Sequence, residues 1–310
     1  MKISLYLWLL IFCLFGISCP ALSAQQSAPQ VVVSIKPIHS LVAGVMLGVG
    51  EPQLLLKGGG SPHGYVLRPS EARALASADL IIWVGHQLES FLEKPLKTLG
   101  QNARQLELSE VLQTQLLPLR ELGDWEAHAH GEAVEHAEKV ALNPHLWLSP
   151  LLAKGVVEQI AVTLAEIDPL HQQQYRKNAE QLQTRLDELH QRLQAKLAPV
   201  KTIPYVVFHD AYQYFESVYG LNVVGSITVD PERQPGARRI LEMREKIARL
   251  KARCVFSEPQ FEPRLLATLI EGTGARTASL DPLGSELAAG AESYFLLLDN
   301  LADDLLRGLQ

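Results

Sequence analysis

Residues 169–197 read PLHQQQYRKNAEQLQTRLDELHQRLQAKL, and the organisation of the chain follows from this stretch. Apolar residues recur every third or fourth position from Ala179 through Leu186 to Leu197, which is typical of one amphipathic helix. At a rise of about 1.5 Å per residue such a helix spans about 45 Å. That is longer than a helix between two neighbouring strands needs to be. We therefore expect a rigid strut that joins two lobes without a flexible linker.

On both sides of this helix, short apolar runs alternate with amphipathic segments. The alternation predicts parallel α/β sheets. Before the long helix, strands are expected at 31–35, 53–56, 79–84 and 105–108, with helices at 37–47, 70–76, 88–99 and 150–165. After it, strands are expected at 203–208, 221–225, 253–256 and 276–280, with helices at 211–219, 236–250, 264–271 and 291–306.

The predicted fold class is therefore α/β, with two parallel βα lobes, one long rigid connecting helix and a cleft between the lobes. The expected domains are a signal peptide at 1–24, an N-terminal lobe at 25–150, connecting helices at 151–200 and a C-terminal lobe at 201–310. The composition suits a globular protein, since 47% of the 310 residues are hydrophobic and 20% are charged. The formal net charge of -6, without any basic stripe, gives no indication of a nucleic-acid partner.

The N-terminus has the features of a secretory signal peptide. Lys2 supplies a positive charge, residues 3–17 are almost wholly apolar, and small residues lead up to a cleavage site after Ala24. This predicts export to the periplasm of a Gram-negative bacterium. Lipoprotein anchoring through Cys19 is less favoured, because a glycine stands three positions before that cysteine. The mature chain keeps only Cys254, so we expect neither an internal disulfide nor thiolate ligands for a metal.

Three histidines stand where the apolar pattern breaks. His63 lies in the Gly/Pro-rich loop 57–69, His145 in the segment Asn143–Pro150, and His209 at the end of the predicted strand 203–208. Ligands of parallel α/β sheets bind beyond the carboxyl ends of the strands. A single histidine in such a place is more often a hydrogen-bonding residue than a ligand, but three together favour a shared site. Neutral imidazole is a common ligand of Zn²⁺, so we expect these three to bind zinc in one cleft.

Further polar residues are weaker candidates for the metal site. Asp281 follows the predicted strand 276–280, where it could be a fourth ligand, bond to a ligating water or imidazole from a second shell, or cap a turn before Pro282. Residues 123–140 are acidic and lack an apolar period, which predicts a mobile loop. We expect its histidines to be weak accessory metal ligands, because chelation would cost the loop ordering entropy. They are His128, His130 and His136.

Several motifs resemble those of one family of transport proteins. They include Ser61-Pro62-His63-Gly64-Tyr65, His145-Leu146-Trp147-Leu148-Ser149-Pro150, Phe208-His209-Asp210-Ala211-Tyr212 and Leu280-Asp281-Pro282-Leu283-Gly284. On these residues the mature chain is similar to the ZnuA-type periplasmic zinc-binding proteins of bacterial ABC importers, within the metal-specific substrate-binding cluster. The resemblance implies a zinc-capture protein rather than an enzyme. It would act as a monomer and deliver Zn²⁺ to a membrane permease that works with a cytoplasmic ATPase.

The resemblance also implies which residues bind the metal and where this chain departs from its relatives. The family's three ligating histidines correspond to His63, His145 and His209, whereas manganese-binding relatives place a carboxylate at the third position. Some members have a glutamate where Pro62 stands, and some pair the cysteine matching Cys254 with a cysteine near the C-terminus, which residues 301–310 do not contain.

Three alternative functions remain at this point. The same scaffold could be tuned for manganese or iron. Zinc bound by three imidazoles and a water could form the active site of a hydrolytic enzyme, with Asp281 or Glu258 as the general base. A surface adhesin would need the lipoprotein anchor at Cys19.

Overall fold

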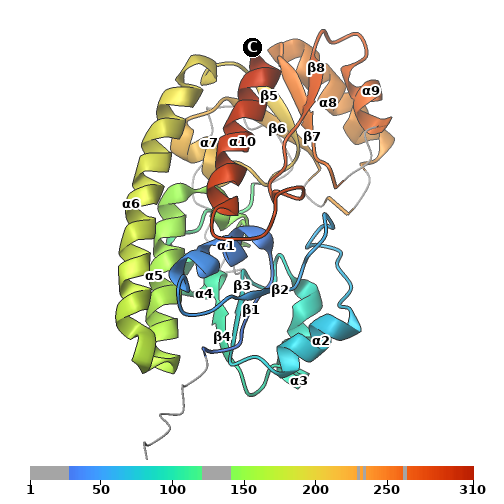
Figure 1. Cartoon of the computed structure of the whole chain (residues 1–310). Helices are drawn as coiled ribbons and strands as arrows, with labels where there is room; N and C mark the ends of the chain where they lie inside the picture. The colour runs from blue at the N-terminus through green and yellow to red at the C-terminus, as the bar shows by residue number, and fades with distance from the viewer. Residues whose placement is uncertain (1–27, 121–140, 229–230, 233–234, 261–263) are drawn as a thin grey trace, which may run out of the picture.

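The computed structural model describes residues 28–120, 141–228, 231–232, 235–260 and 264–310. Two α/β lobes are stacked on each other; the long helix α6 (Gln172–Leu197) runs along one side of both, and α5 (Pro150–Ile167) lies against α6 beside the N-terminal lobe (Figure 1). The predicted fold class, two parallel lobes joined by one long helix, is confirmed. The predicted signal peptide and the whole predicted loop 123–140 lie outside the described residues.

The N-terminal lobe contains a parallel sheet of four strands in the order β2-β1-β3-β4. The central strands are buried along their whole length, as expected for a parallel sheet that is covered on both faces. The strands are β1 (Val31–Val33), β2 (Gln53–Leu54), β3 (Leu80–Trp83) and β4 (Arg104–Glu107). The helices of this lobe are α1 (Lys36–Val45), α2 (Pro69–Ala76), α3 (Glu93–Thr98) and α4 (Leu108–Val111).

The C-terminal lobe repeats this topology in its own parallel sheet, with the strand order β6-β5-β7-β8. In each lobe the first strand is central and the later strands are added on both sides of it, so its carboxyl end lies where the strand order reverses, the usual place for a ligand. The strands are β5 (Tyr205–His209), β6 (Val223–Thr228), β7 (Cys254–Ser257) and β8 (Arg276–Ser279). The helices are α7 (Gln213–Tyr219), α8 (Ala237–Leu250), α9 (Arg264–Ile270) and α10 (Ser293–Leu309).

Helices α5 (Pro150–Ile167) and α6 (Gln172–Leu197) connect the lobes. Residues Pro169–His171 form a 3-10 turn, so the α-helix itself begins at Gln172 and its 26 residues span about 39 Å. The predicted apolar stripe is buried, from Ala179 to Leu197. Near the middle of α6, Leu182 packs so closely on α1 that a Cβ at Gly44 would lie 2.7 Å from its Cδ1.

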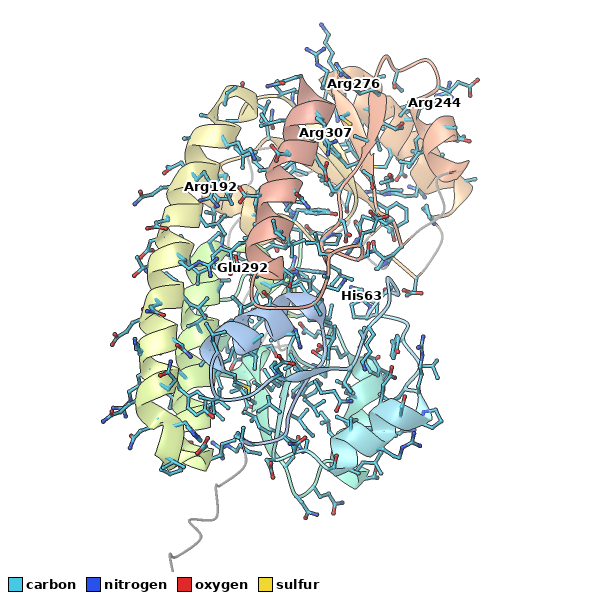
Figure 2. All side chains as sticks on the ribbon, viewed as in Figure 1. His63, Arg192, Arg244, Arg276, Glu292 and Arg307 are labelled. Atoms are coloured by element: carbon cyan, nitrogen blue, oxygen red, sulfur yellow. The ribbon has the colours of Figure 1, made fainter. Side chains whose placement is uncertain are left out.

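Polar contacts fasten α6 to both lobes. Asn178 donates its side-chain amide to the carbonyls of Val45 (2.8 Å) and Leu47 (2.9 Å) in the N-terminal lobe. Three ion pairs of 2.8 Å or less join α6 to α10 or to the residue just before it, and Figure 2 labels Arg192 on α6 and Glu292 at the start of α10. These pairs are Arg185–Glu292, Arg192–Asp299 and Lys196–Asp303. Helix α6 therefore has its own polar contacts with each of the two lobes.

One helix differs clearly from the prediction. The expected helix 88–99 is a 3-10 turn at Ser90–Leu92 followed by the short α3. Pro95 explains the difference, because proline has no amide hydrogen and is tolerated only in the first turn of a helix. The helix must therefore begin close to Pro95, at Glu93. Within the described parts of the chain, we find no helix that combines the length and the apolar character needed to cross a membrane.

Candidate metal centre

The structure brings His63, His145 and His209 together between the lobes. His63 lies on the loop that follows β2, His145 precedes the 3-10 turn Leu146–Leu148, and His209 is the last residue of β5. Figure 2 shows His63 at the junction of the lobes. One ring nitrogen from each histidine lies within 4.8 Å of the other two. Among the described residues, this is the one group of three or more histidine, cysteine or acidic side chains that is close enough to bind a metal ion.

Asn143 sets the orientation of the His145 ring. The side-chain amide of Asn143 donates to the carbonyl of Asp210 and to Oε1 of Gln213, both at 2.9 Å. Its oxygen therefore faces His145, where it accepts from the backbone amide (3.0 Å) and from ring Nδ1 (2.8 Å). Because an amide oxygen only accepts, Nδ1 of His145 carries the proton and Nε2 presents a lone pair.

Glu258 does the same for His209. It is the first residue after β7, which pairs directly with β5, and its side chain is almost wholly buried. Its Oε1 accepts from Nδ1 of His209 at 2.6 Å. A carboxylate behind an imidazole fixes the ring and its tautomer and makes the other nitrogen a better metal ligand. Nε2 of His209 therefore faces into the site, where it presents a lone pair when the ring is neutral.

The two oriented lone pairs face the same point. Nε2 of His145 lies 3.2 Å from Nε2 of His209 and 3.4 Å from Nε2 of His63. Burial and, as the smaller cause, the neighbouring His209 lower the pKa of His63 to about 3. Burial and both neighbouring histidines lower the pKa of His145 well below its usual value. Histidines 63 and 145 are thus neutral at pH 7, the form that binds metals.

A small cavity of about 10 Å³ lies at the three rings. That volume is enough for about one water molecule, and hence for a small ion. Both lobes contribute to its wall, together with the segment around His145. The lining residues are Ser61, Pro62, His63, His145, Trp147, His209, Glu258, Gln260, Pro282 and Leu283.

Asp281 is not in the histidine group. Its Oδ1 accepts from the backbone amides of Leu283 and Gly284, and its Oδ2 from the amide and hydroxyl of Ser285. Gln260, which lines the cavity, donates to Oδ1 at 3.2 Å. The geometry thus gives Asp281 the bonds of a turn-capping residue and no direct contact with the three rings. His128, His130 and His136 lie outside the described residues.

Two polar residues of the site had no such role in the sequence reasoning. The sequence places Asn143 within a motif and offers Glu258 as a candidate general base, but it does not predict that either side chain orients an imidazole. A signal for Glu258 was present, because it follows the strand predicted at 253–256 just as His209 follows its own strand. The order of the strands, which the sequence does not state, decides that these two ends are neighbours.

A buried ion cluster lies beneath His209. The guanidinium of Arg120 bonds to both oxygens of Asp210 and to Oε2 of Glu216 at 2.7 Å. Burial raises the pKa of Glu216 to about 7, although Arg120 opposes the shift. Because the carbonyl of Asp210 also accepts from Asn143, the cluster links the segments that carry His145 and His209. The sequence alone predicts no such role for Arg120.

Comparison with known proteins shows what this chain is similar to. The family model described as zinc-uptake complex component A, periplasmic (ZnuA), matches residues 31–308. The high-affinity zinc uptake system protein ZnuA of Brucella abortus (strain 2308) is 46% identical over 300 residues, covering 89% of this chain and 90% of the relative. A crystal structure of ZnuA has a TM-score of 0.77 at 26% identity, covering 92% of this chain and all of that one. A zinc-bound ZnuA deletion mutant has a TM-score of 0.75 at 26% identity, covering 92% and 99%.

Proposed function

Because this chain belongs to the ZnuA family of periplasmic zinc-uptake components, we propose that it captures Zn²⁺ and delivers it to an ABC importer. Zinc is the transported ligand of this protein rather than a resident cofactor. We propose that His63, His145 and His209 bind the ion through their ring nitrogens in the cavity between the lobes.

The observation that carries the proposed site is the convergence of imidazole lone pairs. Two neutral imidazoles whose Nε2 atoms face each other at 3.2 Å repel through their lone pairs, and either a proton or a metal cation between them removes that repulsion. Tetrahedral zinc with Zn–N bonds of roughly 2.0–2.1 Å separates its nitrogen ligands by roughly 3.3–3.4 Å. The spacings from His145, 3.2 Å to His209 and 3.4 Å to His63, are close to that value. The rings therefore need little rearrangement to bind the ion.

We propose that water completes the coordination. No carboxylate of the described residues belongs to the histidine group. Glu258 already accepts from His209, and Asp281 from the turn that follows it. The cavity offers space on the scale of one water molecule. Three neutral imidazoles and water would leave the occupied site with the full charge of the ion.

The donor set favours zinc over manganese. Imidazole suits zinc, whereas manganese is better served by carboxylate and carbonyl oxygens. An enzyme would need a base next to the bound water. The two carboxylates nearest to that role, Glu258 and Asp281, are engaged as described. The geometry therefore supports transport better than hydrolysis.

The test is a zinc titration of residues 25–310, stripped of metal, against a chelator and against Mn²⁺. We expect one tight zinc per chain and a clear preference over manganese. His63→Ala should abolish tight binding. His86→Ala is the matched control, since that ring is 61% exposed and lies outside the cavity. Tight zinc that persists in His63→Ala, or that is lost equally in His86→Ala, would rule out the proposed site.

The remaining assignments are proposals of the same kind. We propose that residues 1–24 direct export, that 25–150 and 201–310 act as the two lobes, and that 151–200 hold them together. We further propose that the protein is a monomer that docks on a permease driven by a cytoplasmic ATPase. Light scattering and co-purification with a membrane-embedded permease would test these points.

A further inference from the structure

Lys36 connects the two lobes beside the metal cavity. It is the first residue of α1 in the N-terminal lobe, and 7% of its surface is exposed. Its ammonium donates to the carbonyls of Gly284 (2.7 Å), Ser285 (2.8 Å) and Leu287 (2.8 Å), on the loop that follows β8. An ammonium has three donors, so all of them are used on one loop of the other lobe.

Lys36 and Asp281 hold the same peptide group from opposite ends. The peptide between Gly284 and Ser285 presents its carbonyl to the Lys36 ammonium and its amide to Oδ2 of Asp281, at 2.7 and 2.6 Å. Both bonds are charge-assisted, which makes them stronger than bonds between neutral groups. Gly284 has a φ of 63°, a conformation that costs glycine little and fixes the direction of the turn.

This turn forms part of the metal cavity. Pro282 and Leu283, inside the turn that Asp281 caps, line the cavity beside the three histidines. The carbonyl of Pro282 accepts from the indole nitrogen of Trp147 at 2.7 Å, and Trp147 also lines the cavity. The turn that lines the metal cavity is thus held by Lys36 of the N-terminal lobe, by Asp281 of the C-terminal lobe and by Trp147, which follows His145.

We propose that Lys36 is a positioning residue for zinc retention. Through the Gly284–Ser285 peptide and Asp281, it keeps the Pro282–Leu283 wall closed over the metal in both the zinc-free and the zinc-bound protein. Asp281 therefore acts on the cavity through the turn and not as a ligand. This inference rests on the proposed zinc site, but the state of the turn can be measured without any metal.

The first experiment follows amide hydrogen exchange at residues 281–287 in the zinc-free chain 25–310. We expect slow exchange in the unchanged protein and fast exchange in Lys36→Met, which keeps the length of the side chain and removes its donors. Asp281→Asn tests the other end of the same unit, and it should also speed exchange at Ser285. Fast exchange in the unchanged protein, or continued slow exchange in the variants, would overturn the proposal.

The second experiment measures zinc dissociation after addition of excess chelator. Lys36→Met and Asp281→Asn should each still bind one zinc but release it about tenfold faster, a change that corresponds to about 1.4 kcal/mol. The double variant should be no faster than the more affected single variant. If Asp281→Asn weakens zinc while Lys36→Met does not, Asp281 acts on the metal independently and the proposal fails.

Asn178→Ala is the matched control. Asn178 is also buried and also donates to two backbone carbonyls across an interface, but it lies on α6 away from the cavity. It should lower stability without changing the zinc dissociation rate. An equal change of rate in this variant would mean a general loosening and would count against Lys36. If the unchanged chain binds no zinc, the proposed function fails, while the exchange measurement still tests the Lys36 unit.

Discussion

The hydrogen bond from His209 to Glu258 gives the sharpest quantitative test of the metal centre. Glu258→Gln keeps the size of the side chain and an oxygen that can accept from Nδ1 of His209, now at 2.6 Å from the carboxylate. It removes the negative charge. A hydrogen bond to a charged group contributes about 1.5–3 kcal/mol and a neutral one about 0.5–1.5 kcal/mol. The difference of about 1 kcal/mol predicts roughly fivefold weaker zinc binding, because about 1.4 kcal/mol corresponds to tenfold.

Glu258→Ala should have a larger effect, since nothing then accepts from the His209 ring. Loss of a partner behind a metal ligand typically weakens binding by about 10–100-fold. The assay is zinc competition with a chelator of known affinity, and one zinc per chain should remain in both variants. The expected order of affinity is unchanged protein, then Glu258→Gln, then Glu258→Ala.

Asp168→Asn is the control for this test. Asp168 is a buried carboxylate that also accepts from Nδ1 of a histidine, His171, at 2.7 Å. It lies at the end of α5 that is remote from His145, about 27 Å along the 18-residue helix. It should cost stability and leave zinc affinity unchanged. Unaltered affinity in both Glu258 variants, or an equal loss in Asp168→Asn, would refute the assigned role.

Three further outcomes are expected. The pKa of His63 is about 3 in the folded chain and about 6.5 when unfolded, so between these values the unfolded state binds more protons and the zinc-free protein loses stability as pH falls. Urea midpoints at pH 7 and pH 5 should show that loss, and equal midpoints would contradict it. Gly308→Ala should lower stability by about 1–3 kcal/mol in urea without altering zinc stoichiometry, because its Cβ would lie 2.5 Å from the ring of Phe256. Deleting residues 124–138 should leave the tight site intact in a zinc titration, and a large loss of affinity would show that the segment contributes to it.

Much of the architecture could be predicted from local sequence. The apolar runs locate most strands, and apolar residues repeated every three or four positions locate most helices. These patterns are local, because the residues that share the buried face of one helix or strand are close together in sequence. The strut is an example, since its stripe from Ala179 to Leu197 is buried as expected. Pro95 shows that apolar periodicity alone does not fix where a helix begins. Because proline lacks an amide hydrogen, α3 begins at Glu93, close to Pro95.

The positions of the histidines could also be predicted. His63 and His209 follow strands, and the carboxyl ends of parallel strands share one edge of the sheet. That rule places side chains at an edge, but it says nothing about which acidic groups face them. Asp281 and Glu258 both come after strands of the C-terminal lobe. Their sequence contexts do not show which of the two carboxylates bonds to a histidine of the site.

By itself, then, the sequence determined two parallel lobes, a rigid strut and three imidazoles at the ends of chain segments. Tertiary structure decided the partners of those imidazoles. Glu258 reaches His209 because β7 lies next to β5, whereas the carboxylate of Asp281 turns back onto the amides of its own turn. The physical reason is that periodicity reports burial along one segment, while hydrogen bonds between segments depend on strand order and turn direction, which arise only when distant parts of the chain pack.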